Sequence, residues 1–295
     1  MKFADASPPV LFRADSYDSV GLGHVKRCAA LAQALRKLGS GSVFAVYTQD
    51  AAIDGTLGPL GMPVVRLGSR VNTDNDISAT VALTKQYGTR TVVVDSYAVD
   101  EAYFQTYHDA GQLVAYFEDY GRVDWPVDAV INGLIGAETL GYQSPHKLLG
   151  ADYMALGPEY WAPEPDNSRD GGPFEIMITM GGIDHFDLTS RILAILDKMD
   201  QELKVHVVAG PYFQNEDNIE VVIERCRHPI LIHKQLDSLA PIISRCQMAV
   251  SAGGITLYEL AAFGVPTVGI WLWENQRQNV ERLGKAGVIR SLGYE

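Results

Sequence analysis

The sequence of 295 residues has few cysteines, no long apolar run and fewer basic than acidic residues. Its three cysteines, Cys28, Cys226 and Cys246, are widely spaced and form no CxxC pair, so neither a disulfide framework nor a metal site is expected. No apolar run approaches the roughly 18 residues of a membrane span, and residues 1–6 lack the apolar core of a signal peptide. We therefore expect a cytoplasmic protein without stable membrane insertion.

Positive charge is scarce as well. The chain has 24 Lys and Arg against 36 Asp and Glu, which gives a net charge of −12. This balance argues against nucleic acid or an anionic membrane as a partner, because both are densely negative. An acidic protein can still bind a phosphate group through glycine loops and helix N-termini. The best-known loops of that kind are absent, since neither GxxxxGK[ST] nor GxGxxG with a trailing acid occurs.

Short β-forming runs alternate with amphipathic helical patterns through both halves of the chain. In the first half, strands are predicted at residues 10–13, 42–47, 63–66, 91–95, 112–117 and 129–132, and helices at 24–38, 77–87 and 100–110. In the second half, strands are predicted at 174–179, 204–209, 229–232, 248–250 and 266–271, and helices at 188–199 and 256–263.

A stretch rich in Pro, Gly and polar residues, 161–173, separates the two halves and is the predicted linker. The pattern predicts an α/β protein with two doubly wound, Rossmann-like domains, residues 1–160 and 174–295, that face an interdomain cleft. In such sheets, ligands bind beyond the carboxyl ends of the strands.

The most informative motif lies between the first predicted strand and the first predicted helix. Gly21 and Gly23 lie on either side of Leu22, and His24 follows on the first turn of the helix. The free N–H groups and the positive dipole end of a helix start suit an anion. The same field disfavours protonation of His24, which should therefore be neutral near pH 7 and able to accept a proton.

The second half has two similar glycine turns. Gly181 and Gly182 follow one predicted strand, and Gly253 and Gly254 follow another. Paired glycines let the backbone approach a pyrophosphate closely. After the second turn, Thr256 offers a hydroxyl donor, and Glu259 lies three residues on along the same helix face, where it can accept hydrogen bonds from a ribose diol.

Together with Arg13-Ala14-Asp15, Val94-Asp95-Ser96-Tyr97 and Glu274-Asn275-Gln276-Arg277, these turns form an ordered set. The set resembles the UDP-2,4-diacetamido-2,4,6-trideoxy-β-L-altropyranose hydrolases of pseudaminic acid biosynthesis. That family is similar to the GT-B glycosyltransferases, among them the peptidoglycan N-acetylglucosaminyltransferase. The resemblance implies a GT-B-like fold, with UDP in the C-terminal half and the sugar in the N-terminal half. It also implies metal-independent, inverting hydrolysis of the anomeric C–O bond, which releases UDP and a free 6-deoxy sugar.

The resemblance also implies roles for individual residues. His24 is expected to activate water, and Asp15 to orient His24 or to bind sugar hydroxyls. The other expected substrate-binding residues are Arg13, Gly21, Gly23, Asp95, Tyr97, Asn275 and Gln276. The expected UDP-binding residues are Gly181, Gly182, Gly253, Gly254, Thr256 and Glu259. The chain departs from the family pattern at Glu118, where an aspartate is expected, and at Ile183, where a hydroxyl residue is expected.

An inverting hydrolysis needs one base, and UDP is a good leaving group, so this constellation suffices without a metal or any other cofactor. Two alternatives stay open. A glycosyltransferase would pass the sugar to a lipid or saccharide acceptor, and a non-catalytic subunit would bind a UDP-sugar without turnover. The first half has only scattered basic residues rather than a basic, apolar patch, which favours the hydrolase over a membrane-associated transferase. A monomer is the expected state.

Overall fold

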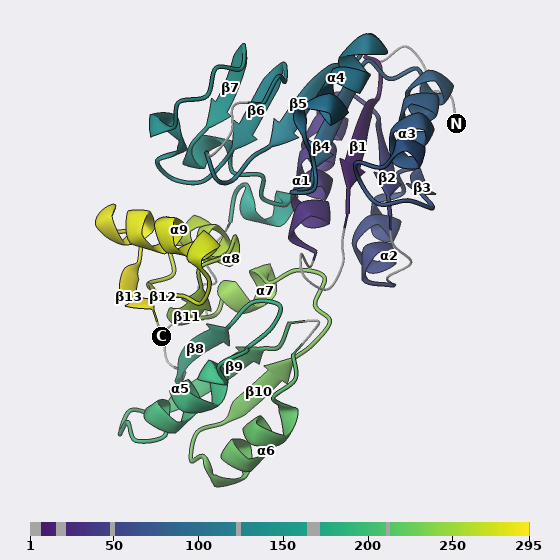
Figure 1. The fold of residues 1–295 in the computed structure, drawn as a ribbon. Helices are drawn as coiled ribbons and strands as arrows, with labels where there is room; N and C mark the ends of the chain where they lie inside the picture. The colour runs from purple at the N-terminus through teal and green to yellow at the C-terminus, as the bar shows by residue number, and fades with distance from the viewer. Residues whose placement is uncertain are drawn as a thin grey trace. The chain divides into compact units, whose positions relative to one another are not determined.

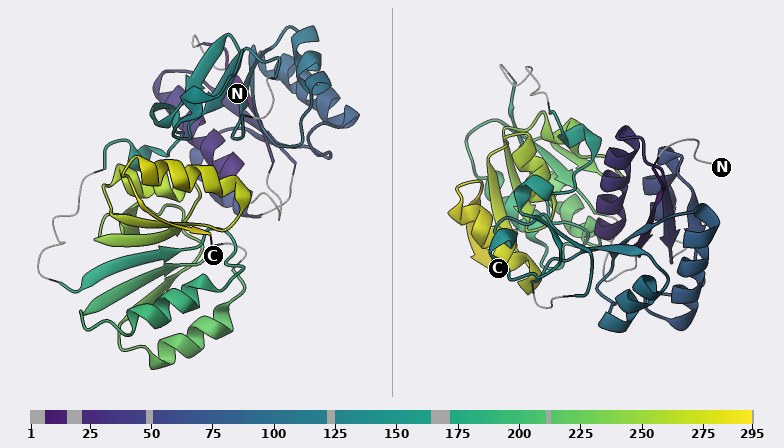
Figure 2. Two further views of the ribbon diagram at one scale, coloured as in Figure 1. Left: turned by 60° about the vertical axis from the view of Figure 1, so that its left-hand side comes forward. Right: turned by 90° about the horizontal axis from the view of Figure 1, so that it is seen from above.

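The computed structural model describes residues 7–15, 22–47, 51–121, 125–163, 172–210 and 213–294. The chain divides into two compact units, Met1–Pro158 and Glu159–Glu295. Each unit contains one parallel sheet covered by helices (Figures 1 and 2). None of the helices in the described ranges is long and apolar enough to cross a membrane.

The sheet of the first unit has seven strands in the order β3-β2-β1-β4-β5-β6-β7. Their bounds are β1 Val10–Ala14, β2 Ser42–Val46, β3 Val64–Arg66, β4 Thr91–Asp95, β5 Leu113–Phe117, β6 Ala129–Asn132 and β7 His146–Leu149. The strand order reverses beside β1, which pairs in parallel with β2 on one side and with β4 on the other. The carboxyl ends of β1 and β4 therefore meet at the switch point, the place where the strand order reverses and where doubly wound sheets bind ligands.

Helices cover both faces of this sheet. They are α1 Gly23–Lys37, α2 Ala51–Leu57, α3 Asp74–Tyr87 and α4 Glu101–Asp109, with 3₁₀ turns at Gly58–Leu60, Ala137–Thr139 and Ala151–Tyr153. A fourth 3₁₀ turn, Pro158–Tyr160, spans the boundary between the first and second units in the chain. Successive strand residues point to opposite faces. Leu11 accordingly packs into the core beneath α3 and α4, and Phe12 into the core beneath α1 and α2. Thr73 and Asp100 cap α3 and α4, because their side chains accept N–H bonds from the first turn.

The sheet of the second unit has six strands in the order β10-β9-β8-β11-β12-β13. Their bounds are β8 Phe174–Thr179, β9 Leu203–Val208, β10 Ile230–His233, β11 Met248–Ala252, β12 Thr267–Trp271 and β13 Arg290–Tyr294. The helices are α5 Leu188–Leu196, α6 Glu216–Arg225, α7 Ala240–Ile243, α8 Thr256–Ala262 and α9 Glu274–Lys285. The order reverses here between β8 and β11, so the carboxyl ends of those two strands mark the second switch point.

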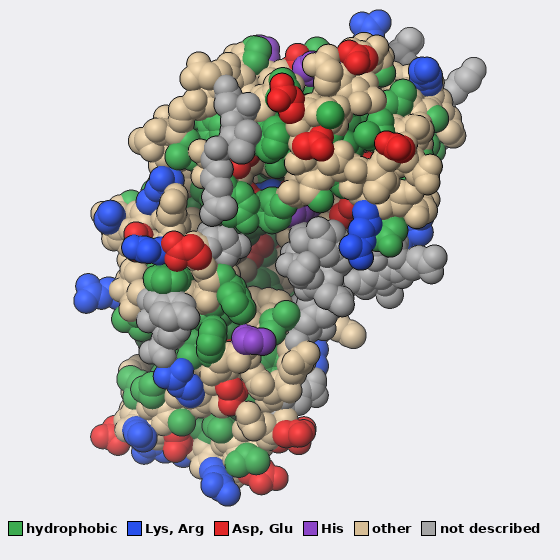
Figure 3. Space-filling model, in the orientation of Figure 1, with side chains coloured by type: hydrophobic (Ala, Val, Ile, Leu, Met, Phe, Trp, Pro, Cys, Tyr) green, Lys and Arg blue, Asp and Glu red, His purple; other side chains and the backbone are tan. Residues whose placement is uncertain are grey.

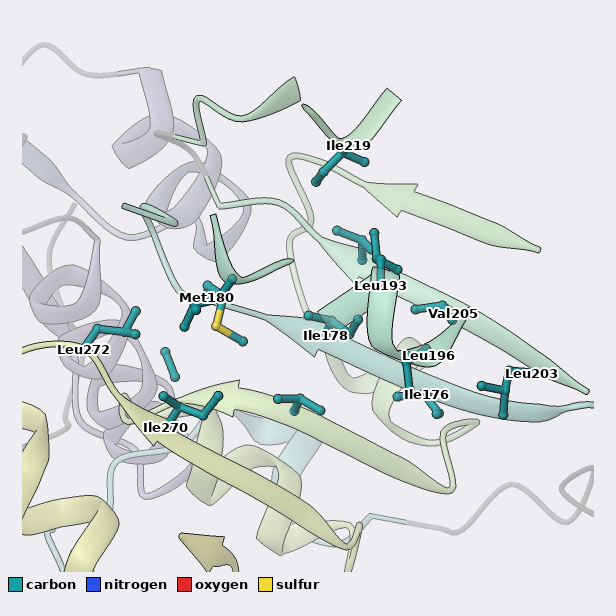
Figure 4. Close-up of a cluster of buried hydrophobic side chains, with 14 residues drawn as sticks. Ile176, Ile178, Met180, Leu193, Leu196, Leu203, Val205, Ile219, Ile270 and Leu272 are labelled. Carbon is teal, nitrogen blue, oxygen red and sulfur yellow. The ribbon is translucent and has the colours of Figure 1, made fainter. Parts of the chain in front are cut away.

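One buried core joins α5 and α6 to the sheet of the second unit. Figure 4 shows Ile176, Ile178 and Val205 from the strands beside Leu193 and Leu196 from α5. Leu193 and Val205 are fully buried. This core covers the face of the sheet opposite α8 and α9. It includes residues near the carboxyl ends of β8 and β11 and so holds those ends in place.

The predicted alternation of strands and helices is confirmed, and the strands beginning near residues 10, 42, 64, 91, 113 and 129 lie within two residues of their predicted starts. The structure adds β7, β13, α2, α6, α7 and α9, which the sequence pattern missed. Residues 164–171 of the predicted linker lie outside the described residues. Just before that stretch, Tyr160 belongs to the second unit: its ring contacts Phe263, and its hydroxyl accepts a hydrogen bond from the Leu239 N–H.

Charged side chains on the described surface are mixed in sign. On the face drawn in Figure 3, Lys and Arg are spread among Asp and Glu on both units. On this face the described residues form no continuous basic surface, in keeping with the excess of acidic over basic residues in the chain.

Candidate functional site

His24 lies at the switch point of the first unit. It is the second residue of α1, which follows β1, and it is 5% exposed. Its Nδ1 lies 3.6 Å from Oδ1 of Asp95, the last residue of β4. The Tyr97 ring meets the imidazole edge-on, with 4.6 Å between ring centroids. The structure thus brings together three of the predicted site residues, His24, Asp95 and Tyr97.

The surroundings of His24 keep its ring neutral. Burial lowers the pKa of His24 below its ordinary value, because the charged form loses hydration. The Asp95 carboxylate acts in the opposite direction, and the Arg27 guanidinium adds to the lowering. The net shift is downward, so at pH 7 the imidazole is unprotonated and can accept a proton.

Arg27 connects the carboxylates around His24. Its Nε and Nη2 donate to Asp95 at 2.5 and 2.7 Å, and its Nη1 donates to Asp119 at 2.7 Å. The Tyr97 hydroxyl donates to the other oxygen of Asp119 at 2.7 Å. The guanidinium lies over the Phe117 ring, 4.7 Å from its centroid. One buried cation is thereby held between two carboxylates, and one of these carboxylates faces His24.

The charges in this cluster shift one another's pKa. Burial opposes the charge on Arg27, but Asp119 and Asp95 raise its pKa well above the ordinary value. Burial likewise opposes ionisation of Asp119, but Arg27 and the Tyr97 hydroxyl bring its pKa below the usual range. Both groups therefore stay charged. Arg27 and Asp119 were not predicted as site residues from the sequence, although Arg27 lies three residues after His24 on the same side of the helix.

Glu118 holds the loop that carries Asp119. Its buried carboxylate accepts hydrogen bonds from the N–H groups of Tyr120 and Gly121 at 3.0 and 2.6 Å, and from the Tyr142 hydroxyl. Glu118, where the resemblance leads one to expect an aspartate, therefore fixes the loop through its backbone contacts. The aspartate that follows it, Asp119, makes the contact with Arg27.

Arg13 and Asp15 form a separate buried network. Arg13 lies on the α3–α4 face of β1 and is fully enclosed; its Nε donates to Asp76 at 2.7 Å, and its Nη1 donates to Asp15. Asp15 also accepts the N–H groups of Tyr47 at 3.1 Å and Val71 at 3.2 Å. Among the described residues, the carboxylate that faces the His24 ring is Asp95 rather than Asp15. Gly21 lies outside the described residues, and Gly23 begins α1 with open space around it.

The first glycine turn of the second unit follows β8. Gly181 has φ +77°, a left-handed conformation that favours glycine, and both Gly181 and Gly182 are exposed. The backbone of Gly210 packs directly against the turn, where a Cβ would collide with Gly181 and Gly182. The start of α5, predicted to hold an anion, already has one: Asp184 accepts the N–H groups of Leu188 and Thr189 at 2.9 and 2.8 Å.

The second glycine turn packs against α9. A Cβ on Gly253 would lie 2.6 Å from Val280 Cγ2 and 2.8 Å from Gln276 Cβ, whereas one on Gly254 would meet nothing within 4 Å. Asn279 Nδ2 donates to the Gly253 carbonyl at 2.9 Å and thereby ties the turn to the helix. One side of the turn is thus closely packed, and the other, at Gly254, is open.

The neighbouring predicted residues lie on α8 and α9. Thr256 begins α8 and is half-buried, as is Glu259 one turn later. The Gln276 side chain is held by the backbone of its own loop, since its Oε1 accepts the Leu272 N–H at 3.0 Å. Asn275 belongs to α9, but its side chain lies outside the described residues. No group of three or more possible metal ligands occurs within the described ranges.

Replacing Gly253 with alanine is expected to lower the free energy of unfolding by about 1–3 kcal/mol, because the new methyl group overpacks the contact with α9. Gly254→Ala is the matched control, since its added Cβ meets nothing within 4 Å. Urea denaturation of both variants measures the difference. Equal midpoints for the two variants would contradict the close packing of Gly253.

No family model matches the chain, but several curated proteins are similar to it at low identity. The uncharacterized protein MJ1062 of Methanocaldococcus jannaschii is 24% identical over 276 residues, which cover 90% of this chain and 56% of that protein. The spore coat polysaccharide biosynthesis protein SpsG of Bacillus subtilis is 26% identical over 187 residues, or 62% and 55% of the two chains.

A third relative carries a description that names an activity. The pseudaminic acid cytidylyltransferase and UDP-2,4-diacetamido-2,4,6-trideoxy-beta-L-altropyranose hydrolase of Helicobacter pylori is 22% identical over 289 residues, or 96% of this chain and 48% of that protein. The chain is therefore a distant relative of this protein, and it spans about half the length of the curated relatives that it matches.

Solved structures establish the class of fold. MurG of Acinetobacter baumannii matches with a TM-score of 0.69 at 15% identity, covering 97% of this chain and 86% of that one. A complex of Staphylococcus aureus MnaA with UDP matches with a TM-score of 0.65 at 11% identity, covering 97% and 84%. Anabaena HepE with UDP and glucose matches with a TM-score of 0.58 at 11% identity, covering 90% of this chain and 81% of that one. The chain has a GT-B fold with two Rossmann-like domains, as the sequence predicts.

Proposed function

We propose that this protein hydrolyses a UDP-sugar at the anomeric C–O bond, with His24 as the general base and without a metal. The observation that carries the proposal is the neutral, buried imidazole at the switch point of the first unit, with Asp95 at one ring nitrogen. The activity named for the Helicobacter pylori relative and the UDP complexes of proteins with the same fold support a UDP-linked substrate.

The geometry suits removal of a proton from water. Because Asp95 faces Nδ1, the tautomer with a proton on Nδ1 is favoured, and Nε2 has the lone pair that takes the water proton. The water oxygen forms a bond to the anomeric carbon on the face opposite UDP, and the C–O bond breaks as its electron pair leaves with UDP. Asp95 then stabilises the imidazolium that has formed.

We assign the nucleotide to the second unit and the base that activates water to the first. Backbone N–H groups at Gly181, Gly182, Gly253 and Gly254 would stabilise the charge of the departing diphosphate, with the Thr256 hydroxyl as a further donor. The half-buried Glu259 would accept hydrogen bonds from the ribose hydroxyls.

Asn275 and Gln276 keep the roles that their sequence motif implies, and the roles of the other predicted residues follow from their exposure and partners. Asn275, Gln276 and Tyr97 are assigned to the glycosyl group. Asp95 contacts His24, so its role is to orient and stabilise the base. Arg13 and Asp15 are positioning residues in this proposal, since their side chains are buried in bonds to each other and to the loops at Tyr47 and Val71.

A sugar transfer is the second candidate. The same base would deprotonate an acceptor hydroxyl instead of water, and the likeness of the fold to solved glycosyltransferases supports this chemistry as the alternative. A non-catalytic UDP-sugar-binding subunit is the third and predicts binding without turnover.

The test is UDP release from a panel of UDP-HexNAc and UDP-6-deoxy-diacetamido sugars in ¹⁸O-labelled water, without acceptor or metal. Label in the sugar and none in UDP supports hydrolysis with C–O cleavage. Label in UDP contradicts the mechanism, because it places the break at phosphorus. Tight UDP binding without turnover overturns the hydrolase and favours the transferase or the binding subunit.

The pH dependence of kcat/KM follows from the pKa of His24. Since burial lowers the pKa of His24 below 6.5, the imidazole stays mostly unprotonated as the pH falls toward 6.5. We therefore expect kcat/KM to stay constant down to pH 6.5 and to decline only below it, measured with a substrate whose own groups do not titrate there. An acid limb centred above 6.5 would contradict the proposed state of His24.

Replacing Glu259 with glutamine is expected to weaken UDP binding about 5-fold to 10-fold, because a charged acceptor of the ribose hydroxyls becomes a neutral one. Isothermal titration with UDP measures the effect. Glu220→Gln, an exposed position on α6, is the control with unchanged affinity. Equal affinities for the two variants would remove Glu259 from the proposed ribose site.

A further inference from the structure

Three aromatic rings gather at the carboxyl end of the second sheet. His185 and Phe186 come from the loop after β8, and Trp273 from the loop after β12. The centroid of the Trp273 ring lies 5.7 Å from that of His185 and 6.1 Å from that of Phe186, and the rings of His185 and Phe186 are 5.9 Å apart. Phe186 is 37% exposed and Trp273 48% exposed. We refer to these three residues as the aromatic platform.

The platform lies on the α9 side of the second glycine turn. Trp273 is the N-cap residue of α9, and α9 packs on Gly253 through Gln276 and Val280. β8 and β12 both pair with β11, the strand that leads into the turn, so the two loops of the platform flank the turn. The rings therefore border the place assigned to the diphosphate.

Glu259 lies on the other side of the same turn. Tyr160 packs on Phe263, the C-cap residue of α8, and accepts the Leu239 N–H, so it lies between α8 and the start of α7. Glu259 lies one helical turn before Phe263, on the same face of α8, and therefore on this α7 side of the turn. A UDP-sugar whose ribose reaches Glu259 thus has its glycosyl group directed toward α9.

We propose that the aromatic platform is the surface against which the glycosyl ring of the bound UDP-sugar stacks. This inference rests on the proposed function. The C–H bonds of a pyranose carry small positive charges that suit the negative face of an aromatic ring, whereas the diphosphate would be repelled by it. Trp273 and Phe186 still have exposed area available for such contact, and their mutual contacts hold them in place before the ligand arrives.

The affinities for UDP and for UDP-N-acetylglucosamine, measured separately by titration calorimetry, test the inference. For Trp273→Ala we expect UDP-N-acetylglucosamine to bind roughly 3-fold to 10-fold more weakly while the affinity for UDP is unchanged. Trp273→Phe should restore most of the lost affinity, because it keeps an aromatic face. Ile195→Ala, at a position on α5 that is 62% exposed, is the control without effect on either ligand.

The possible outcomes separate this inference from the proposed function. A wild-type protein that binds neither ligand overturns both. If the wild type binds both ligands but Trp273→Ala weakens UDP to the same degree as the UDP-sugar, the platform contacts the nucleotide and the inference is wrong. Unchanged affinity of Trp273→Ala for both ligands also overturns the inference and leaves the proposed function intact.

Discussion

His24→Gln is expected to lower kcat by about 10²–10⁴-fold and to leave the affinity for UDP unchanged. The loss corresponds to removal of the group that takes the proton from water, and glutamine keeps a polar side chain of similar size at the start of α1. The unchanged affinity follows because the nucleotide is assigned to the second unit. Single-turnover UDP release and titration with UDP measure the two quantities on the same preparation.

Two further variants make this result specific. Asp95→Asn should lower kcat less than His24→Gln does, because the base remains and only the carboxylate that stabilises its protonated form is lost. His228→Gln, at a buried histidine whose Nε2 contacts the Leu196 carbonyl in the second unit, should leave kcat unchanged. Full activity of His24→Gln would exclude this residue as the base, and a parallel loss of UDP affinity would contradict the division of roles between the units.

Arg27→Ala is expected to lower the free energy of unfolding by about 3–5 kcal/mol, because it leaves buried carboxylates without their cation. Asp95 would lose two charge-assisted hydrogen bonds and Asp119 would lose one. Urea denaturation measures the change. As a control, Arg277→Ala should leave the midpoint nearly unchanged, since the Arg277 ion pairs with Glu274 and Glu281 are exposed to water.

A double variant keeps this prediction falsifiable. Adding Asp95→Asn to Arg27→Ala removes one of the stranded charges, so the double variant should be more stable than Arg27→Ala alone. If Asp95→Asn destabilises both backgrounds equally, the two residues are not coupled, which would contradict the bidentate contact between them. Wild-type stability of Arg27→Ala would contradict the buried position of the cluster.

The alternation of apolar runs was enough to predict the fold, because a parallel sheet needs a buried strand and a covering helix in turn. It was not enough for β7 and β13, which are short edge strands of mixed polarity. The missed helix α9 is strongly polar apart from one apolar side, and α6 is similar.

The site was predictable where its residues belong to short sequence motifs, as His24, Asp95 and Tyr97 do. The glycine turn placed His24 at the start of a helix, as the structure has it. Arg27, one turn later, was counted only among the scattered basic residues of the first half, because its two acidic partners are 68 and 92 residues away. Arg13 was assigned to substrate from its motif alone. Since both faces of β1 are covered by helices, the two-residue period of the strand could not show that this side chain is enclosed.

The arrangement of Arg27 between Asp95 and Asp119 also sets the charge balance of the reaction. With His24 neutral, these four side chains sum to one negative charge; when His24 takes a proton, they sum to zero. This cluster of four side chains therefore carries no net positive charge at any point of turnover, and such a charge would hold back the anionic product. In its resting state, the same net negative charge repels a diphosphate, so a nucleotide that approached the first unit with its phosphates foremost would be turned away.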